Sequence, residues 1–167
     1  MLVAMDVQYD DARHVARGAL IGFEDWTSAQ TVCEKVVLVE SFAEYQAGAF
    51  FQRELGILIQ LLQGVENITI IVIDGYARLP NGHALGQMLS EALGHAFPIV
   101  GMAKSPFRSM ESQFVHRGQG HRPLYVTAVG MDEKEAAAYI KSMYGPFRLP
   151  SLLVRVDHLA RGYCDPH

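Results

Sequence analysis

The chain has 167 residues and half of them are hydrophobic, so it is long enough to form one domain with a sizeable core. Its formal net charge of −4 argues against a protein that holds nucleic acid mainly through a broad cationic surface, but not against one that grips a short stretch through a metal ion and local Lys or Arg. Two cysteines without metal-ligand spacing, Cys33 and Cys164, and the lack of a signal peptide or a membrane-spanning apolar run predict a soluble cytoplasmic protein with free thiols.

The first third of the chain predicts a meander of strands followed by a helix. Residues 2–9 are mostly apolar, which is typical of a strand covered on both faces, and short polar connections separate them from the apolar runs 14–23 and 34–42. Residues 47–63 have helical periodicity and end at Gly64, a natural C-cap. The further predicted elements are a strand at 68–74, a helix at 84–97, a strand at 98–104, a strand at 123–130, a helix at 132–145 and a helical segment at about 150–162.

Residues 105–122 show neither the periodicity of a helix nor that of a strand. We therefore predict a mobile, locally basic loop there, which contacts the substrate. Its basic residues are Arg108, His116, Arg117, His121 and Arg122. The order of the other elements, three hairpin-linked strands, a helix, a parallel-type strand and then alternating helices and strands, is typical of a ribonuclease H-like α/β domain. We therefore expect a single domain over 1–167, with a mixed sheet (an antiparallel three-strand meander plus parallel strands) and helices on both faces.

One acidic residue lies on the apolar side of the first predicted helix. At 100° per residue, Glu54 falls inside the apolar arc beside Phe50, Leu58 and Leu61. An unpaired carboxylate that faces a sheet costs several kcal/mol, so Glu54 needs a cation, a proton or a metal.

Two further acids lie in the strands that this topology places side by side at the sheet centre. Asp6 interrupts the first strand, and Asp74 ends the fourth strand directly before Gly75. With Glu54 these carboxylates would converge and repel unless Mg²⁺ or Mn²⁺ neutralised them, and two such ions can drive phosphodiester cleavage. The alternative is that Asp6 is a turn-proximal acid, Glu54 pairs with a buried Lys or Arg, and Asp74-Gly75 is a favoured turn pair.

Six blocks of the sequence, in order, resemble the endonuclease V family from the first residues to about residue 160. They are "MDVQY", "YQAGAFFQRELG", "VIDGYARLP", "VGMAKSPF", "PLYVTAVG" and "FRLP". The resemblance implies a ribonuclease H-like fold and cleavage of DNA or RNA at the second phosphodiester on the 3′ side of inosine.

The resemblance assigns metal binding to three acids, Asp6, Glu54 and Asp74. It assigns Lys104 to the scissile phosphate, where a cation stabilises developing charge, although a strand-end lysine can equally reach solvent. His158 matches a His or Asp near the metals; Asp157 takes that place if the alignment slips by one, and a helix-surface histidine is the ordinary interpretation.

The resemblance also assigns three substrate-binding residues. Tyr45 matches an aromatic strand-separating wedge, but "EYQA" replaces the usual Pro-Tyr-Ile-Pro, and an exposed tyrosine before a helix is equally common. Gly48 and Gly75 match glycines that let the backbone approach a flipped base, or else serve a helix entry and a turn. Ala77 and Leu79 replace a family glycine and histidine. These departures favour single-stranded or structured RNA, whose bases are already unstacked.

Three functions therefore stay open at this point. The first is a Mg²⁺- or Mn²⁺-dependent endonuclease acting on inosine-containing DNA or RNA. The second is a weakly active or inactive nucleic-acid-binding or interaction module on the same fold, which the acidic net charge and altered pocket motifs favour. The third is a small-molecule phosphoesterase on the same metal core, for which no residue argues.

Overall fold

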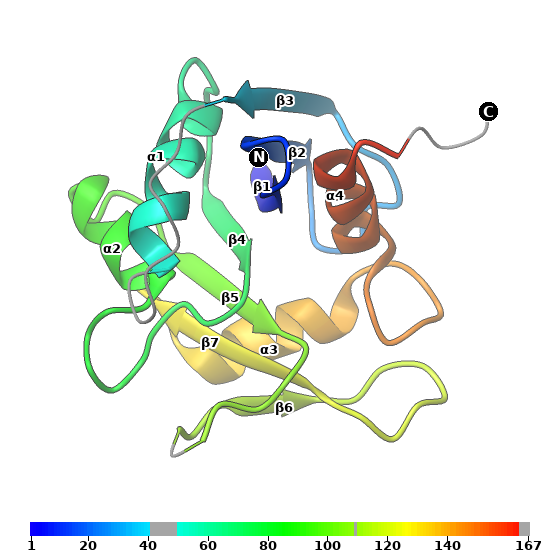
Figure 1. Cartoon of the computed structure of the whole chain (residues 1–167). Helices are drawn as coiled ribbons and strands as arrows, with labels where there is room; N and C mark the ends of the chain where they lie inside the picture. The colour runs from blue at the N-terminus through cyan, green and yellow to red at the C-terminus, as the bar shows by residue number, and fades with distance from the viewer. Residues whose placement is uncertain (41–49, 109, 164–167) are drawn as a thin grey trace.

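The computed structural model describes residues 1–40, 50–108 and 110–163, which form one layered α/β domain (Figure 1). Within these residues the strands are β1 (Leu2–Asp10), β2 (Val15–Phe23), β3 (Cys33–Val39), β4 (Ile70–Asp74), β5 (Ile99–Ala103), β6 (Gln113–Val115) and β7 (Leu124–Val129). The helices are α1 (Phe50–Leu62), α2 (Leu85–Ala92), α3 (Glu133–Ser142) and α4 (Ser151–Arg161). None of these helices has the length and hydropathy that a membrane span requires.

The described strands make one mixed sheet in the order β3-β2-β1-β4-β5-β7-β6. β1, β2 and β3 form an antiparallel meander, β1, β4 and β5 are parallel, and β7 and β6 continue antiparallel from β5. The predicted mixed sheet is confirmed, including the pairing of the first strand with the fourth. Met5 pairs with Ile73, so Asp6 and Asp74 each follow directly after paired residues of adjacent parallel strands.

Two hydrophobic layers sandwich the sheet, with α1 and α2 on one face and α3 and α4 on the other (Figure 1). Because side chains alternate along a strand, Met5 and Ile73 belong to the α1–α2 layer, whereas Ala4 and Val72 belong to the α3–α4 layer. Asp6 and Asp74 lie two positions after Ala4 and Val72. Both carboxylates therefore face the side of the sheet that α4 covers.

The structure differs from the sequence prediction in residues 105–122. This segment contains β6, which pairs with β7, and Arg117 is buried with 8% exposure. The prediction that the whole segment is a loop was wrong, because a strand of three residues is too short to show periodicity. The second helix also ends earlier than predicted, since Gly94 and His95 both have positive φ, at 61° and 58°.

The turn that follows β4 packs against two glycines. Ala77 is fully buried, and its N–H donates to Thr127 Oγ1 at 2.8 Å. A Cβ atom on Gly86 would lie 2.5 Å from Ala77 Cα, and one on Gly101 would overlap the backbone nitrogen of Ala77. The backbone after Asp74 is thus held close to both α2 and β5.

Candidate active site

Asp6 is buried at the centre of the sheet and is held by its own strand. Asp6 is only 5% exposed to solvent. One carboxylate oxygen accepts the N–H of Val7 at 2.8 Å, and the other accepts Nε2 of Gln8 at 3.3 Å. These two hydrogen bonds fix the carboxylate without supplying a positive charge.

Asp74 ends β4 beside Asp6, where the chain turns sharply away. Gly75 has a φ of +101°, which favours glycine, and its N–H donates to the carbonyl oxygen of Met102 at 2.9 Å. Lys104, just after β5, donates through Nζ to Asp74 Oδ2 at 3.1 Å. Asp74 and Lys104 therefore meet at the carboxyl ends of β4 and β5, beside Asp6 in the middle of β1. The carboxyl ends of parallel strands are a common place for ligand sites in α/β sheets.

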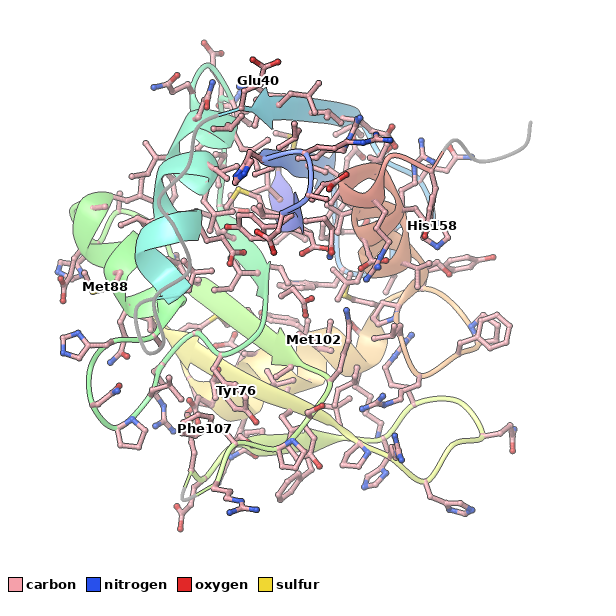
Figure 2. All side chains as sticks on the ribbon, viewed as in Figure 1. Glu40, Tyr76, Met88, Met102, Phe107 and His158 are labelled. Atoms are coloured by element: carbon pink, nitrogen blue, oxygen red, sulfur yellow. The ribbon has the colours of Figure 1, made fainter. Side chains whose placement is uncertain are left out.

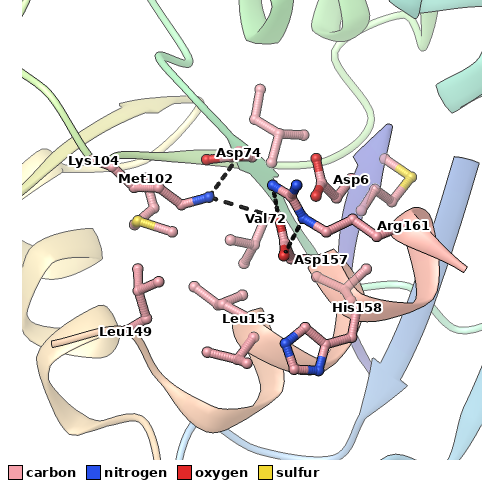
Figure 3. A pocket seen from close by; sticks show the side chains of 14 residues that line it. Asp6, Val72, Asp74, Met102, Lys104, Leu149, Leu153, Asp157, His158 and Arg161 are labelled. Carbon is pink, nitrogen blue, oxygen red and sulfur yellow. Dashed lines mark hydrogen bonds and ion pairs between the residues drawn. The ribbon is translucent and has the colours of Figure 1, made fainter. Parts of the chain in front are cut away.

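A third carboxylate reaches this point from α4. Asp157 accepts two hydrogen bonds from Arg161, at 2.8 and 3.1 Å, and lies 4.0 Å from Lys104 Nζ. Figure 3 shows Asp157 directed toward Lys104 and Asp6, whereas the imidazole of His158 is directed away from the carboxylates. Of the two candidates that the sequence left open on this helix, the structure brings Asp157 to the acids.

The carboxylates of this group titrate differently. Burial, and next the negative charge of Asp74, raise the pKa of Asp6 from 3.8 to about 6, against the opposing hydrogen bonds from Gln8 and Val7. Burial acts to raise the pKa of Asp157 as well, but the hydrogen bonds and charge of Arg161 overcome it, and the pKa is lowered. Asp157 is therefore fully anionic near neutral pH, and Asp6 is the acid that lacks compensating positive charge.

The residues around Asp6 and Asp74 line a cavity of about 280 Å³, which we call the carboxylate pocket. Its polar lining comes from Asp6, Asp74, Lys104, Asp157, His158 and Arg161, and its apolar lining includes Val72, Met102, Leu149 and Leu153 (Figure 3). Three carboxylates and two cations meet here, so ionisation of all five leaves one negative charge uncompensated.

Whether this group fits a divalent metal ion depends on how many protein ligands the ion needs. Within residues 1–40, 50–108 and 110–163, no group of three or more His, Cys, Asp or Glu side chains is arranged to hold a metal. Mg²⁺, however, is usually held by one or two carboxylates, with waters and substrate phosphates completing its coordination. Asp6 and Asp74 meet that smaller requirement with the oxygen ligands that Mg²⁺ and Mn²⁺ prefer.

Glu54 is buried, with 5% exposure, as its place on the helical wheel predicted. It lies on α1, which covers the opposite face of the sheet from α4, and it does not contribute to the described lining of the carboxylate pocket. Its participation in a metal site stays a prediction. Tyr45 and Gly48 lie outside the described residues, so their assigned roles stay predictions too.

Two aromatic rings that the sequence analysis did not single out as site residues lie near the carboxyl ends of β4 and β5. The Tyr76 and Phe107 rings pack edge to face, with centroids 5.9 Å apart (Figure 2). The Tyr76 hydroxyl donates to the Ser105 carbonyl and accepts the Phe107 N–H, both at 2.9 Å. Their positions, two residues after Asp74 and three after Lys104, were the available sequence signal.

Comparison with known proteins gives a clear structural likeness. No protein-family model and no curated protein matches the sequence. Endonuclease V from Streptomyces avermitilis is 23% identical with a TM-score of 0.77, and the match covers 96% of this chain and 79% of that one. Endonuclease V from Ciona intestinalis, in complex with a 24mer DNA containing an inosine followed by a ribo-adenosine, is 15% identical with a TM-score of 0.78, covering 96% and 84%.

Endonuclease V from Bacillus subtilis is 16% identical with a TM-score of 0.74, over 96% of this chain and 78% of the other. At these identities the likeness establishes a shared fold. The chain therefore has the ribonuclease H-like fold that the sequence predicted.

Proposed function

We propose that this protein is a metal-dependent endonuclease of the endonuclease V type, which hydrolyses a phosphodiester 3′ to inosine in DNA or RNA. The observation that carries the proposal is the pair Asp6 and Asp74, which directly follow the paired residues Met5 and Ile73 of adjacent parallel strands and face one pocket with Lys104 and Asp157. The fold shared with three endonuclease V structures supports it, one of which holds inosine-containing DNA.

In this proposal Asp6 and Asp74 would hold Mg²⁺ or Mn²⁺, which when bound would supply the charge that activates water and stabilises the leaving oxygen. Lys104 is 36% exposed at its side chain, so its ammonium group can turn from Asp74 to a substrate phosphate. Asp157 is kept ionised by Arg161 beside Asp6, so its carboxylate would accept a hydrogen bond from the attacking water and orient it. Glu54 keeps the metal-binding role that the resemblance assigns. The place near the metals that the resemblance leaves to His158 or Asp157 goes to Asp157 in this proposal, because the imidazole of His158 is directed away from the carboxylates.

The substrate base would lie next to the aromatic pair. Phe107 is 49% exposed, and its ring and that of Tyr76 offer flat surfaces on which a base can stack. Gly75, with Tyr45 and Gly48 from the resemblance, would border the same base. A base that is already unstacked needs no wedge, so a single strand is the substrate we expect to be preferred.

A second candidate, a nucleic-acid-binding module without hydrolysis, is favoured by one observation. Lys104 already lies against Asp74 at 3.1 Å and partly neutralises the acids without a metal. Such a module would bind the same strands but leave them intact.

The test uses end-labelled single-stranded RNA and DNA with one inosine each, incubated with the protein in Mg²⁺, Mn²⁺ or EDTA. A metal-dependent cut one nucleotide beyond the inosine supports the endonuclease. If Asp74→Asn abolishes this cleavage and the exposed control Glu66→Gln keeps it, the cleavage is assigned to the carboxylate pocket. Cleavage that survives Asp74→Asn contradicts the proposal. Inosine-dependent binding with no cleavage in either metal supports the binding module instead.

A further inference from the structure

A second cavity adjoins the carboxylate pocket and has a different chemistry. It has a volume of about 410 Å³ and lies between the turn that joins β1 to β2 and the end of α4. We call it the arginine pocket; its lining includes Gln8, Tyr9, Arg13, Arg17, Arg161 and Tyr163. Three guanidinium groups in one concavity contrast with the net charge of −4 of the whole chain.

The two pockets are continuous through shared side chains. Arg161 lines both of them and makes its ion pair with Asp157 on the carboxylate side. Gln8 lines the arginine pocket and donates to Asp6 at 3.3 Å. A polymer that enters the carboxylate pocket can therefore extend past Gln8 and Arg161 without leaving the surface.

Arg17 is positioned by the end of α4 and not by an acid. It lies opposite Gln8 in the β1–β2 register, and its guanidinium packs on Gly162, where a Cβ atom would come within 3.3 Å of Arg17 Nε. Gly162 caps α4 with a φ of +76°, and a helix C-terminus carries partial negative charge that favours a cation. Within the described part of the chain no carboxylate forms an ion pair with Arg17, so among these residues its guanidinium charge is not neutralised.

The remaining lining fits phosphate better than a neutral ligand. Asp10 is the acid in the described lining, and it lies 3.6 Å from Arg13, whose side chain is 83% exposed. Guanidinium groups bind phosphate oxygens through paired, charge-assisted hydrogen bonds. Tyr163, 57% exposed at the rim, offers a ring to a base or sugar.

We infer that the arginine pocket binds backbone phosphates of the nucleic-acid strand whose scissile bond lies in the carboxylate pocket, independently of sequence. This inference rests on the proposed function, since it assigns the pocket to the same substrate. Phosphate contacts position a strand without reading its bases, so the pocket sets where the strand lies, and the inosine site sets what is cut.

The test is the salt dependence of binding, measured by fluorescence anisotropy on labelled single-stranded RNA and DNA in EDTA, where no cleavage occurs. For single strands the slope of log K against log salt changes by about 0.7 for each phosphate contact. We expect Arg17→Gln and Arg13→Gln each to reduce the slope by about 0.7, and the double variant to reduce it further. Lys134→Gln, on α3, makes the same change in net charge and should leave the slope unchanged.

Inference and proposed function can fail separately. Unchanged slopes in Arg17→Gln and Arg13→Gln, equal to that of Lys134→Gln, overturn the inference even if the protein cuts beside inosine. Reduced slopes without any cleavage by the native protein uphold the pocket and overturn the nuclease. Arg13 is so exposed that its variant tests the pocket even if Arg17→Gln does not fold.

Discussion

Two charged side chains are buried almost equally in this domain, but they differ in what surrounds them. Asp6 is 5% exposed and Arg117 is 8% exposed. Burial shifts both toward neutrality: together with the charge of Asp74 it raises the pKa of Asp6 to about 6, and it lowers the pKa of Arg117. The Arg117 guanidinium donates to the carbonyl oxygens of Lys141, Met143, Gly145, Phe147 and Arg148. Asp6 instead lies near two further acids, Asp74 and Asp157.

The difference separates a structural charge from a functional one. The donors of Arg117 are satisfied by backbone carbonyls, so the charge closes the loop between α3 and α4 and needs no ligand. Asp6 has hydrogen bonds but too little positive charge, which is the condition in which a buried acid persists because a ligand completes it. Burial alone would not have distinguished the two.

The largest effect should come from removing the charge of Asp6. Asp6→Asn keeps the size of the side chain but removes a proposed metal ligand, so cleavage of inosine-containing RNA should fall by at least about 10³-fold, or about 4 kcal/mol in activation free energy. Initial rates in Mg²⁺ provide the measurement, with Glu66→Gln as control. If the cleavage rate fell less than tenfold, Asp6 would be a structural charge, as Arg117 is.

Arg117→Met should lower the stability of the fold, because Arg117 is not part of the proposed catalytic group. It leaves five carbonyl oxygens without their donor, so we expect the free energy of unfolding to fall by roughly 3 kcal/mol. For a chain of this size that lowers Tm by roughly 6–12 °C. The exposed control Arg122→Met should change Tm little. A normal Tm for Arg117→Met would show that these bonds contribute nothing net.

Asp6 should also make stability depend on pH when no metal is present. Since the pKa of Asp6 rises from 3.8 to about 6 on folding, the folded protein binds this proton more tightly, and its ionisation costs up to about 3 kcal/mol above pH 6. In EDTA, Asp6→Asn should therefore be more stable than the native protein at pH 7.5, and the gap should close as pH falls from 6 toward 4. Urea unfolding at several pH values measures the gap. A gap that is constant with pH contradicts the explanation.

The smallest effect tests whether the two regions are connected. Arg148, whose carbonyl accepts from Arg117, donates to the carbonyl oxygens of Lys104 and Pro123 at 2.6 and 2.7 Å. Both bonds come from one nitrogen of Arg148, and a lysine side chain is one bond shorter. Arg148→Lys therefore keeps the charge but does not reach the two acceptors, so Lys104 should be less well positioned and kcat should fall roughly tenfold with KM unchanged. If the control Arg122→Lys lost as much kcat as Arg148→Lys, the proposed link from Arg148 to Lys104 would be contradicted.

Sequence reasoning reached the structural features that produce periodic patterns. The buried strands and the neighbouring positions of Asp6 and Asp74 followed from apolar runs and from the order of the elements. The pattern could not predict that Arg117 is structural, because its partners are backbone carbonyls, which have no sequence signature. It also left Asp157 and His158 unresolved, since adjacent helical residues differ by 100° and only the packed helix shows which one faces the acids.

The packing of Ala77 between Gly86 and Gly101 constrains how this sequence can change over evolutionary time. The atoms that a Cβ atom at position 86 or 101 would meet are backbone atoms of residue 77, so both positions require glycine whether residue 77 is alanine or glycine. A Cβ atom on Gly101 would also lie 2.6 Å from the carbonyl oxygen of Gly75, directly after Asp74. The path of the chain beside Asp74 therefore fixes glycine at two positions that are distant from it in the sequence.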